Sequence, residues 1–227
     1  EVCDSVHWCS PIYINAMTGG SDAAKKVNAS LARVAAKNSV AMASGSLSAA
    51  LRDETLLSTF SVIRSENPHG FVMANVSAGT SASDALRAVN MIHANALQVH
   101  LNAAQELVMQ EGDRDFRNWL CNIESIVSAC EALSVPVIVK ETGCGISAKD
   151  VHRLKDVGVR TVDVSGRGGT NFVTIENARR NLGDCDYLAD WGLTTVESLV
   201  DIRKCDSLKN MEVFASGGVR TPLDVVR

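Results

Sequence analysis

The feature of this sequence that most restricts its fold is a short apolar run that occurs seven times, each time ending in glycine or small polar residues. The runs begin at about residues 11, 40, 71, 96, 136, 161 and 212, and helix-patterned sequence follows each of them. Strands that are apolar almost throughout are typical of a parallel sheet covered on both faces. Strands that alternate with helices form βα units. The pattern therefore predicts an α/β fold of the (β/α)8 or TIM-barrel type.

The length of the chain suggests that the barrel lacks one unit. A complete barrel typically needs about 250 residues, whereas this chain has 227. With seven visible strands, we expect a single domain over residues 1–227 that lacks the last strand–helix unit. Helices are expected near Asp22–Asn38, Asp53–Ser65, Ser81–His93, Trp119–Leu133, Ser147–Val157, Thr194–Lys204 and from Pro222 onward.

Two long connections, residues 102–118 and 171–191, interrupt the regular alternation of strands and helices. Long connections in a compact domain are usually functional loops. Because both follow strands, we expect them to lie over the mouth of the barrel, where the carboxyl ends of the strands converge and the chemistry of such folds takes place. Most of the reactive side chains in this sequence follow a strand, which indicates an enzyme.

Composition excludes several other classes of protein. The chain has a net charge of −4, only 4% aromatic residues and no long basic block, so generic nucleic-acid or membrane-surface binding is not expected. The seven cysteines are scattered without C-x-x-C spacing, which argues against a zinc site and a disulfide framework. A protein whose cysteines are reduced, in the cytoplasm, is the simplest interpretation. No apolar stretch is long enough to span a bilayer.

Two glycine-rich loops, Ser165–Thr170 and Ser216–Arg220, follow the sixth and seventh runs. Glycine lets backbone N–H groups approach an anion, and the last strands of a barrel often hold a ligand's phosphate. Either loop alone is equally well explained as a tight βα turn. Two such loops on adjacent strands favour a phosphate site.

Other strand ends carry groups suited to an anionic ring cofactor. Lys140 ends the fifth run and would neutralise a phosphate or a reduced flavin, although a lysine there also extends readily to solvent. Ala16, Met17 and Thr18 follow the first run and would line a planar ring. A turn with a buried methionine explains them comparably well.

The segment from His100 to Glu106 is the most unusual stretch. Strand alternation places His100 and Asn102 on one face, with Gln105 and Glu106 soon after. One carboxylate among neutral donors suits Mg²⁺, which typically binds through one or two carboxylates, waters and substrate phosphate oxygens. His100 alone is more simply a core histidine, but the cluster favours a functional site.

These motifs together resemble the type 2 isopentenyl-diphosphate delta-isomerases, which depend on FMN. The resemblance covers nearly the whole chain in order and rests on PIYINAMTGG, SGSLSAAL, Asn75, ALQVHLNAAQELVMQEGDRDF, VPVIVKETGCGIS, VDVSGRGGTNF and VFASGGVRTPLD. The combination of HLN-x-x-QE with NAMTGG and SGRGGTNF is highly specific, whereas glycine loops alone are not.

The resemblance implies a role for each strand end. It implies FMN contacts at Ala16, Met17, Thr18, Ser46, Asn75, Lys140, Ser165, Thr170, Gly217 and Gly218. It implies substrate contacts at His100, Asn102 and Gln105, with His100 and Gln105 as catalytic residues, and a Mg²⁺ ligand at Glu106.

The implied reaction is a redox-neutral 1,3-proton shift between isopentenyl and dimethylallyl diphosphate in isoprenoid biosynthesis. Reduced FMN would act as the acid and base, and NADPH would serve only as the reductant of FMN. The resemblance also implies a homotetramer or homooctamer that binds a small diphosphate substrate.

Two departures from the family pattern stand out. Ser48 occupies a position where some members carry a basic residue for the diphosphate. An N-terminal Arg-Lys-x-x-His segment and the last strand–helix unit of the family are not found in this sequence. We therefore expect a domain that is incomplete at both ends.

Two other functions remain open. FMN-dependent 2-hydroxyacid oxidases and dehydrogenases share the barrel and a strand-terminal lysine, but place a histidine general base before the Gly-Gly of the sixth-strand loop. Here that residue is Arg167, which accepts no proton at neutral pH. A non-catalytic FMN- or phosphate-binding barrel is the second alternative, since it would be free to retain Gln105 and Glu106 without needing them.

Overall fold

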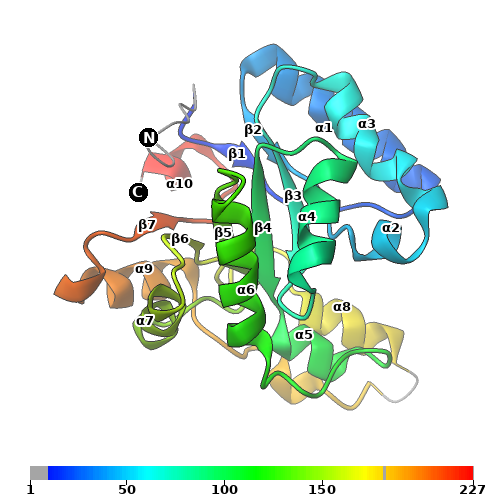
Figure 1. Ribbon diagram of the computed structural model, residues 1–227. Helices are drawn as coiled ribbons and strands as arrows, with labels where there is room; N and C mark the ends of the chain where they lie inside the picture. The colour runs from blue at the N-terminus through cyan, green and yellow to red at the C-terminus, as the bar shows by residue number, and fades with distance from the viewer. Residues whose placement is uncertain (1–9, 181–182, 227) are drawn as a thin grey trace. The chain divides into compact units, whose positions relative to one another are not determined.

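The strands of the protein follow one another in the sheet in the order of the sequence. The computed structural model describes residues 10–180 and 183–226 (Figure 1). The sheet order is β1-β2-β3-β4-β5-β6-β7, and the pairs β1–β2, β2–β3 and β6–β7 are parallel. The strands are β1 Tyr13–Ile14, β2 Ala41–Ala43, β3 Val72–Ser77, β4 Ala96–Leu101, β5 Val137–Glu141, β6 Thr161–Asp163 and β7 Glu212–Phe214.

Helical segments separate successive strands along the chain. The α-helices are α1 Asp22–Asn38, α2 Ser48–Arg52, α3 Ser58–Glu66, α4 Ala82–Met91, α5 Ala103–Val108, α6 Trp119–Glu131, α7 Ala148–Asp156, α8 Phe172–Arg179, α9 Thr195–Arg203 and α10 Pro222–Val226. Short 3₁₀ helices lie at η1 Glu54–Leu56, η2 Asp186–Leu188 and η3 Asp206–Leu208. Parallel strands in sequence order with intervening helices are the (β/α) barrel pattern, so the predicted fold class is confirmed.

Each of the two connections expected to be long loops contains a helix. Residues 102–118 include α5, and residues 171–191 include α8 and η2. The single helix expected over Asp53–Ser65 is also wrong, because the segment is divided into η1 and α3. The 3₁₀ helix η1 begins where Asp53 accepts a hydrogen bond from Thr55 N at 3.0 Å.

The chain divides into two compact units. The first comprises residues up to Val99 together with Asn122–Ile138. In this unit α1 and α3 lie side by side (Figure 1). Its largest fully buried side chains include Phe60, Ile63, Met73 and Leu97.

The second unit comprises His100–Cys121 and the chain from Val139 onward. Here α5 contacts α8 through a small apolar cluster formed by Ala104, Val108, Val173 and Cys185. This cluster packs α5 and α8, one helix from each of the two long connections, against each other.

Side-chain caps begin several of the expected helices. Ser21, Ser81, Ser147 and Thr194 each accept a hydrogen bond from a backbone N–H in the first turn of α1, α4, α7 and α9. Such caps satisfy N–H groups that have no partner inside the helix. None of the helices in residues 10–180 or 183–226 is both long enough and apolar enough to cross a membrane.

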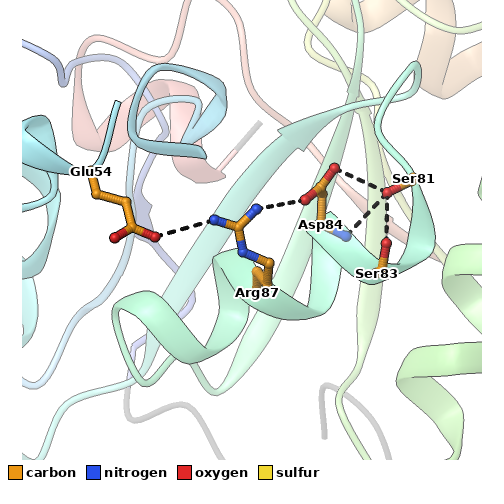
Figure 2. A network of polar contacts seen from close by, with 5 residues as sticks. All are labelled: Glu54, Ser81, Ser83, Asp84 and Arg87. Atoms are coloured by element: carbon orange, nitrogen blue, oxygen red, sulfur yellow. Dashed lines mark hydrogen bonds and ion pairs between the residues drawn. The ribbon is translucent and has the colours of Figure 1, made fainter. Parts of the chain in front are cut away.

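Around α4 the cap belongs to a larger surface network (Figure 2). The Ser81 hydroxyl contacts both Ser83 Oγ, at 3.0 Å, and Asp84 Oδ2, at 3.1 Å. Arg87 then joins Asp84, at 2.8 Å, to Glu54, at 3.3 Å. The network connects the start of α4 to η1 on the surface of the first unit, where exposed ion pairs contribute little to stability.

Candidate active site

In the first unit the loop after β1 is fixed by polar contacts to α1. Thr18 Oγ1 donates to Asn28 Oδ1 at 2.8 Å, and Asn28 Nδ2 donates to Thr18 O at 3.2 Å. Gly45 N also donates to Thr18 O, at 3.1 Å. A Cβ at position 45 would lie 2.4 Å from Thr18 O, so only glycine allows the loop after β2 to approach so closely.

The other predicted FMN contacts of this unit lie on the same two loops and on β3. Met17 is half exposed, whereas Asn75 is buried. Leu47 N donates to Asn75 O at 2.8 Å, which links the Ser46 loop to β3. Ser46 Oγ lies 2.9 Å from Ser48 Oγ, so the hydroxyl at the position that is basic in some family members is turned toward a neighbouring hydroxyl.

In the second unit Lys140 is buried at the end of β5, with 3% of its surface exposed. Its ammonium donates to Glu141 O at 2.5 Å and to Ser165 Oγ at 3.3 Å. Burial lowers the pKa of Lys140, and the charges of Asp163 and Glu141 act in the opposite direction. A lysine extended to solvent is therefore the wrong interpretation of this residue.

Asp163 at the end of β6 is hydrogen-bonded to the first residue of each of the two glycine loops. Its carboxylate accepts Ser165 N at 3.0 Å and the Ser216 hydroxyl at 2.9 Å from each oxygen. Asp163 is fully buried, and a buried carboxylate is retained only when it is hydrogen-bonded or paired. The network therefore fixes the residues from which the loops Ser165–Thr170 and Ser216–Arg220 begin.

The glycines of these loops lie against one another. A Cβ at Gly217 would be 2.0 Å from Gly166 O, and one at Gly218 would be 3.0 Å from Gly168 O. Among the described residues, the backbone N–H groups of Gly168, Gly169, Gly217 and Gly218 donate no hydrogen bond to the protein. Two adjacent loops with unused N–H donors have the chemistry of an anion site.

At the start of α5, Asn102 and Glu106 form a hydrogen-bonded pair. Asn102 Nδ2 donates to Glu106 Oε1 at 2.9 Å, and Asp113 N donates to Glu106 Oε2 at 2.7 Å. Asn102 is buried, yet its Oδ1 atom has no partner within the described part of the chain. A buried oxygen without a partner is costly, so Asn102 Oδ1 is available to accept a bond from a ligand or ion.

Gln105 contacts a residue that the sequence did not single out. Gln105 Nε2 donates to Glu176 Oε1 at 3.2 Å, and Arg179 pairs with Glu176 Oε2 at 2.5 Å. Glu176 lies on α8 and is buried. The helical spacing of Glu176 and Arg179 gave a local signal for the ion pair, but nothing in the sequence linked either residue to Gln105.

Several predicted site residues of the second unit are thus brought together in pairs. Lys140 contacts Ser165, Asn102 contacts Glu106, and the Gly217–Gly218 loop lies against Gly168–Gly169. His100 lies partly buried on β4. The backbone oxygen of Thr170 lies close to Gly143, since a Cβ built on Gly143 would be 3.1 Å from it. In the described residues no group of three His, Cys, Asp or Glu side chains is arranged to hold a metal unaided.

Comparison with known proteins places this geometry in a family. The FMN-dependent dehydrogenase family matches residues 66–227. A protein of Latilactobacillus sakei named isopentenyl-diphosphate delta-isomerase is 54% identical over 220 residues, which are 97% of this chain and 61% of that protein. A protein of the same name from Listeria welshimeri is 52% identical over 96% of this chain and 60% of its own length.

The chain therefore spans about 60% of the length of these curated relatives. A solved structure from Sorangium cellulosum, of the mandelate racemase/muconate lactonizing enzyme class, is 17% identical with a TM-score of 0.51. The match covers 91% of this chain and 46% of the Sorangium chain, and it shows a shared fold alone. The family match covers well over half of the sequence, and the chain belongs to the FMN-dependent dehydrogenase family.

Proposed function

We propose that the full-length protein is an FMN-dependent isomerase that interconverts isopentenyl and dimethylallyl diphosphate by a redox-neutral 1,3-proton shift. The observation that carries the proposal is the polar cluster of Asn102, Gln105 and Glu106 in the second unit, in which a buried Asn102 oxygen has no partner among the described residues. The names of the relatives at more than 50% identity agree with this function.

The chemistry of the second unit fits FMN. The unused N–H groups of the two glycine loops suit a phosphate, and the buried ammonium of Lys140 suits the negative charge of a reduced flavin. Reduced FMN supplies the acid–base chemistry of the proton shift when it is bound. Lys140 and Ser165 would hold it, and Ala16, Met17, Thr18, Ser46 and Asn75 of the first unit remain predicted contacts.

The same unit fits Mg²⁺ only together with a diphosphate. Glu106 offers a single carboxylate, and Asn102 Oδ1 offers one neutral oxygen. Such a donor set binds Mg²⁺ weakly unless phosphate oxygens complete it. Glu106 would therefore hold Mg²⁺ on the diphosphate. Gln105 and His100 would orient the hydrocarbon part of the substrate. Gln105 is itself held by a hydrogen bond of 3.2 Å to Glu176.

Further details of the function extend the same proposal. We propose NADPH as the reductant of FMN; it would serve only to reduce the flavin, since the reaction itself transfers no net electrons. We also propose a place in isoprenoid biosynthesis and a homo-oligomeric state, both from the resemblance, and a cytoplasmic location, from the scattered cysteines.

The proposal is tested by incubating the full-length protein with isopentenyl diphosphate, FMN, a reductant and Mg²⁺, and measuring dimethylallyl diphosphate. Glu106→Gln should keep FMN bound and lose at least about 100-fold in turnover. The reason is that Mg²⁺ loses its anionic protein ligand, and the position of the diphosphate substrate depends on that contact. The control is Glu124→Gln, which makes the same change on an exposed part of α6. Wild-type turnover and Mg²⁺ dependence in Glu106→Gln would contradict the assignment.

A further inference from the structure

The guanidinium of Arg114 forms a set of bonds that the proposed function does not use. It donates to the backbone oxygens of Glu106, Met109, at 2.7 Å, Gly112, at 2.6 Å, and Asp113, at 3.0 Å. Within the described residues Arg114 forms no ion pair with a carboxylate. Its two terminal nitrogens, Nη1 and Nη2, thus lie against main-chain oxygens. These include the carbonyls of Glu106 and Met109 at the end of α5, where helix carbonyls lack a partner inside the helix.

These bonds close a turn over Glu106. Gly112 N donates to Met109 O at 3.3 Å. A Cβ at Gly112 would lie 2.1 Å from Glu106 O, so the turn requires glycine in order to approach the helix. The segment Met109–Arg114 therefore folds back onto the residue proposed as the metal ligand.

The turn also holds the carboxylate itself. Asp113 N donates to Glu106 Oε2 at 2.7 Å, while Asn102 Nδ2 donates to Oε1 at 2.9 Å. Each carboxylate oxygen thus has one hydrogen bond and keeps lone-pair capacity for a ligand. Because Arg114 fixes the backbone that carries the Asp113 N–H, the orientation of Glu106 depends on the guanidinium.

We propose that Arg114 is a positioning residue for Glu106, and that it sets the affinity for Mg²⁺ together with a diphosphate. The inference rests on the proposed function, in which Glu106 is the Mg²⁺ ligand. Hydrogen-bonded neighbours orient metal ligands in many sites, and their loss typically reduces metal affinity 10- to 100-fold. Arg114 acts here through the backbone and does not touch the diphosphate.

Arg114→Lys is the variant that separates geometry from charge. Lysine keeps the positive charge but offers a single ammonium in place of a planar fork, so it cannot reach the oxygens of Glu106, Met109 and Gly112 together. The matched control is Arg117→Lys in the same segment. The Arg117 guanidinium is exposed and pairs with Asp115 at 2.6 Å, without contact to Glu106.

The probe is inorganic pyrophosphate, titrated calorimetrically into the full-length protein at a series of Mg²⁺ concentrations. We expect the half-saturating Mg²⁺ concentration to rise at least about 10-fold in Arg114→Lys. FMN affinity in the same variant should stay within about twofold of wild type, and Arg117→Lys should stay within about twofold in both measurements.

A double-mutant cycle tells positioning from general destabilisation. In a Glu106→Gln background, Arg114→Lys should change the Mg²⁺ requirement by less than about twofold, since the carboxylate it positions is gone. An undiminished effect in that background overturns the proposal, as does a wild-type Mg²⁺ requirement in Arg114→Lys or a wild-type protein that binds pyrophosphate equally with and without Mg²⁺.

The two proposals fail in different experiments. A wild-type protein that binds pyrophosphate with Mg²⁺, yet does not isomerise isopentenyl diphosphate, removes the proposed reaction and leaves the role of Arg114 supported by the titration. Isomerisation with an unchanged Mg²⁺ requirement in Arg114→Lys removes the role of Arg114 alone.

Discussion

Glu141 is a buried carboxyl group directly after Lys140 on β5. Burial raises the pKa of Glu141 to about 7, although hydrogen bonds from Cys144 N, at 2.5 Å, and Thr142 N, at 2.6 Å, and the charge of Lys140 act to lower it. The carboxyl holds the loop that follows β5. Its protonation therefore couples pH to the stability of the second unit.

Glu141→Gln should change how stability depends on pH. Because the folded pKa of about 7 exceeds the ordinary 4.5, the folded state favours the protonated carboxyl. Its stabilising contribution is complete below the ordinary pKa and is lost as pH rises through the folded pKa. Glutamine does not ionise, so its stability relative to wild type should increase by up to about 3 kcal/mol between about pH 5 and pH 8.

Denaturant unfolding of both proteins at several pH values measures this difference. Glutamine keeps a side-chain oxygen that can accept the N–H groups of Thr142 and Cys144, so the loop retains its acceptor. The exposed Glu124→Gln should follow the wild-type curve. Parallel curves for wild type and Glu141→Gln would show that Glu141 does not titrate in this range.

At the residue scale, the sequence identified groups at strand ends but not their long-range partners. Strand alternation placed His100 and Asn102 on one face, the short spacing to Glu106 suggested a cluster, and the structure joins Asn102 to Glu106. Glu176 was missed because it lies 71 positions from Gln105, and no local pattern encodes such a contact. The roles proposed for these side chains in binding FMN, Mg²⁺ or substrate remain predictions.

At the scale of elements, α9 connects helix capping to the candidate phosphate site. Thr194 and Glu197 form a capping box, in which each side chain bonds the other residue's backbone N–H. The next residue, Thr195, places Oγ1 at 2.7 Å from Ser216 O and 2.6 Å from Gly217 O. The start of α9 thereby supports the second glycine loop from one side.

Thr194→Ala should destabilise the protein by about 1 kcal/mol, the usual cost of removing a threonine cap. It should also weaken FMN binding several-fold, since the start of α9 would no longer hold Thr195 against Gly217. Denaturant unfolding and flavin titration give the two values. Thr174→Ala is the control, because the Thr174 side chain is exposed on α8 and caps no helix, and the backbone N–H that it donates to Asn171 Oδ1 is kept in the variant. Equal effects of both substitutions would argue against the cap as the cause.

Element positions followed from local pattern where the pattern was strong. The apolar runs gave every strand start to within two residues; β4, β6 and β7 begin at the expected positions Ala96, Thr161 and Glu212. The helices α5 and α8 were not expected, because each is short and is stabilised by the contact of Val108 with Val173 and Cys185. Tertiary packing of this kind overrides weak local propensity.

At the scale of the whole molecule, the remaining choice is between isomerase and redox enzyme. The chain belongs to a family whose name, FMN-dependent dehydrogenase, denotes a redox reaction. The relatives at more than 50% identity are instead named isomerases. Arg167 separates the two chemistries. Its backbone N–H donates to Leu193 O at 2.9 Å, and its guanidinium lies 3.6 Å from Asp190 Oδ1.

A guanidinium stays protonated at neutral pH and cannot remove a proton from a 2-hydroxyacid. The full-length protein with FMN should therefore fail to reduce a dye acceptor in the presence of lactate or glycolate, even over many hours. With reduced FMN, Mg²⁺ and isopentenyl diphosphate in deuterated water, it should form dimethylallyl diphosphate that carries solvent deuterium, without net consumption of reductant. Steady dye reduction by a 2-hydroxyacid, with no deuterium in recovered diphosphate, would assign the protein to the redox branch of its family.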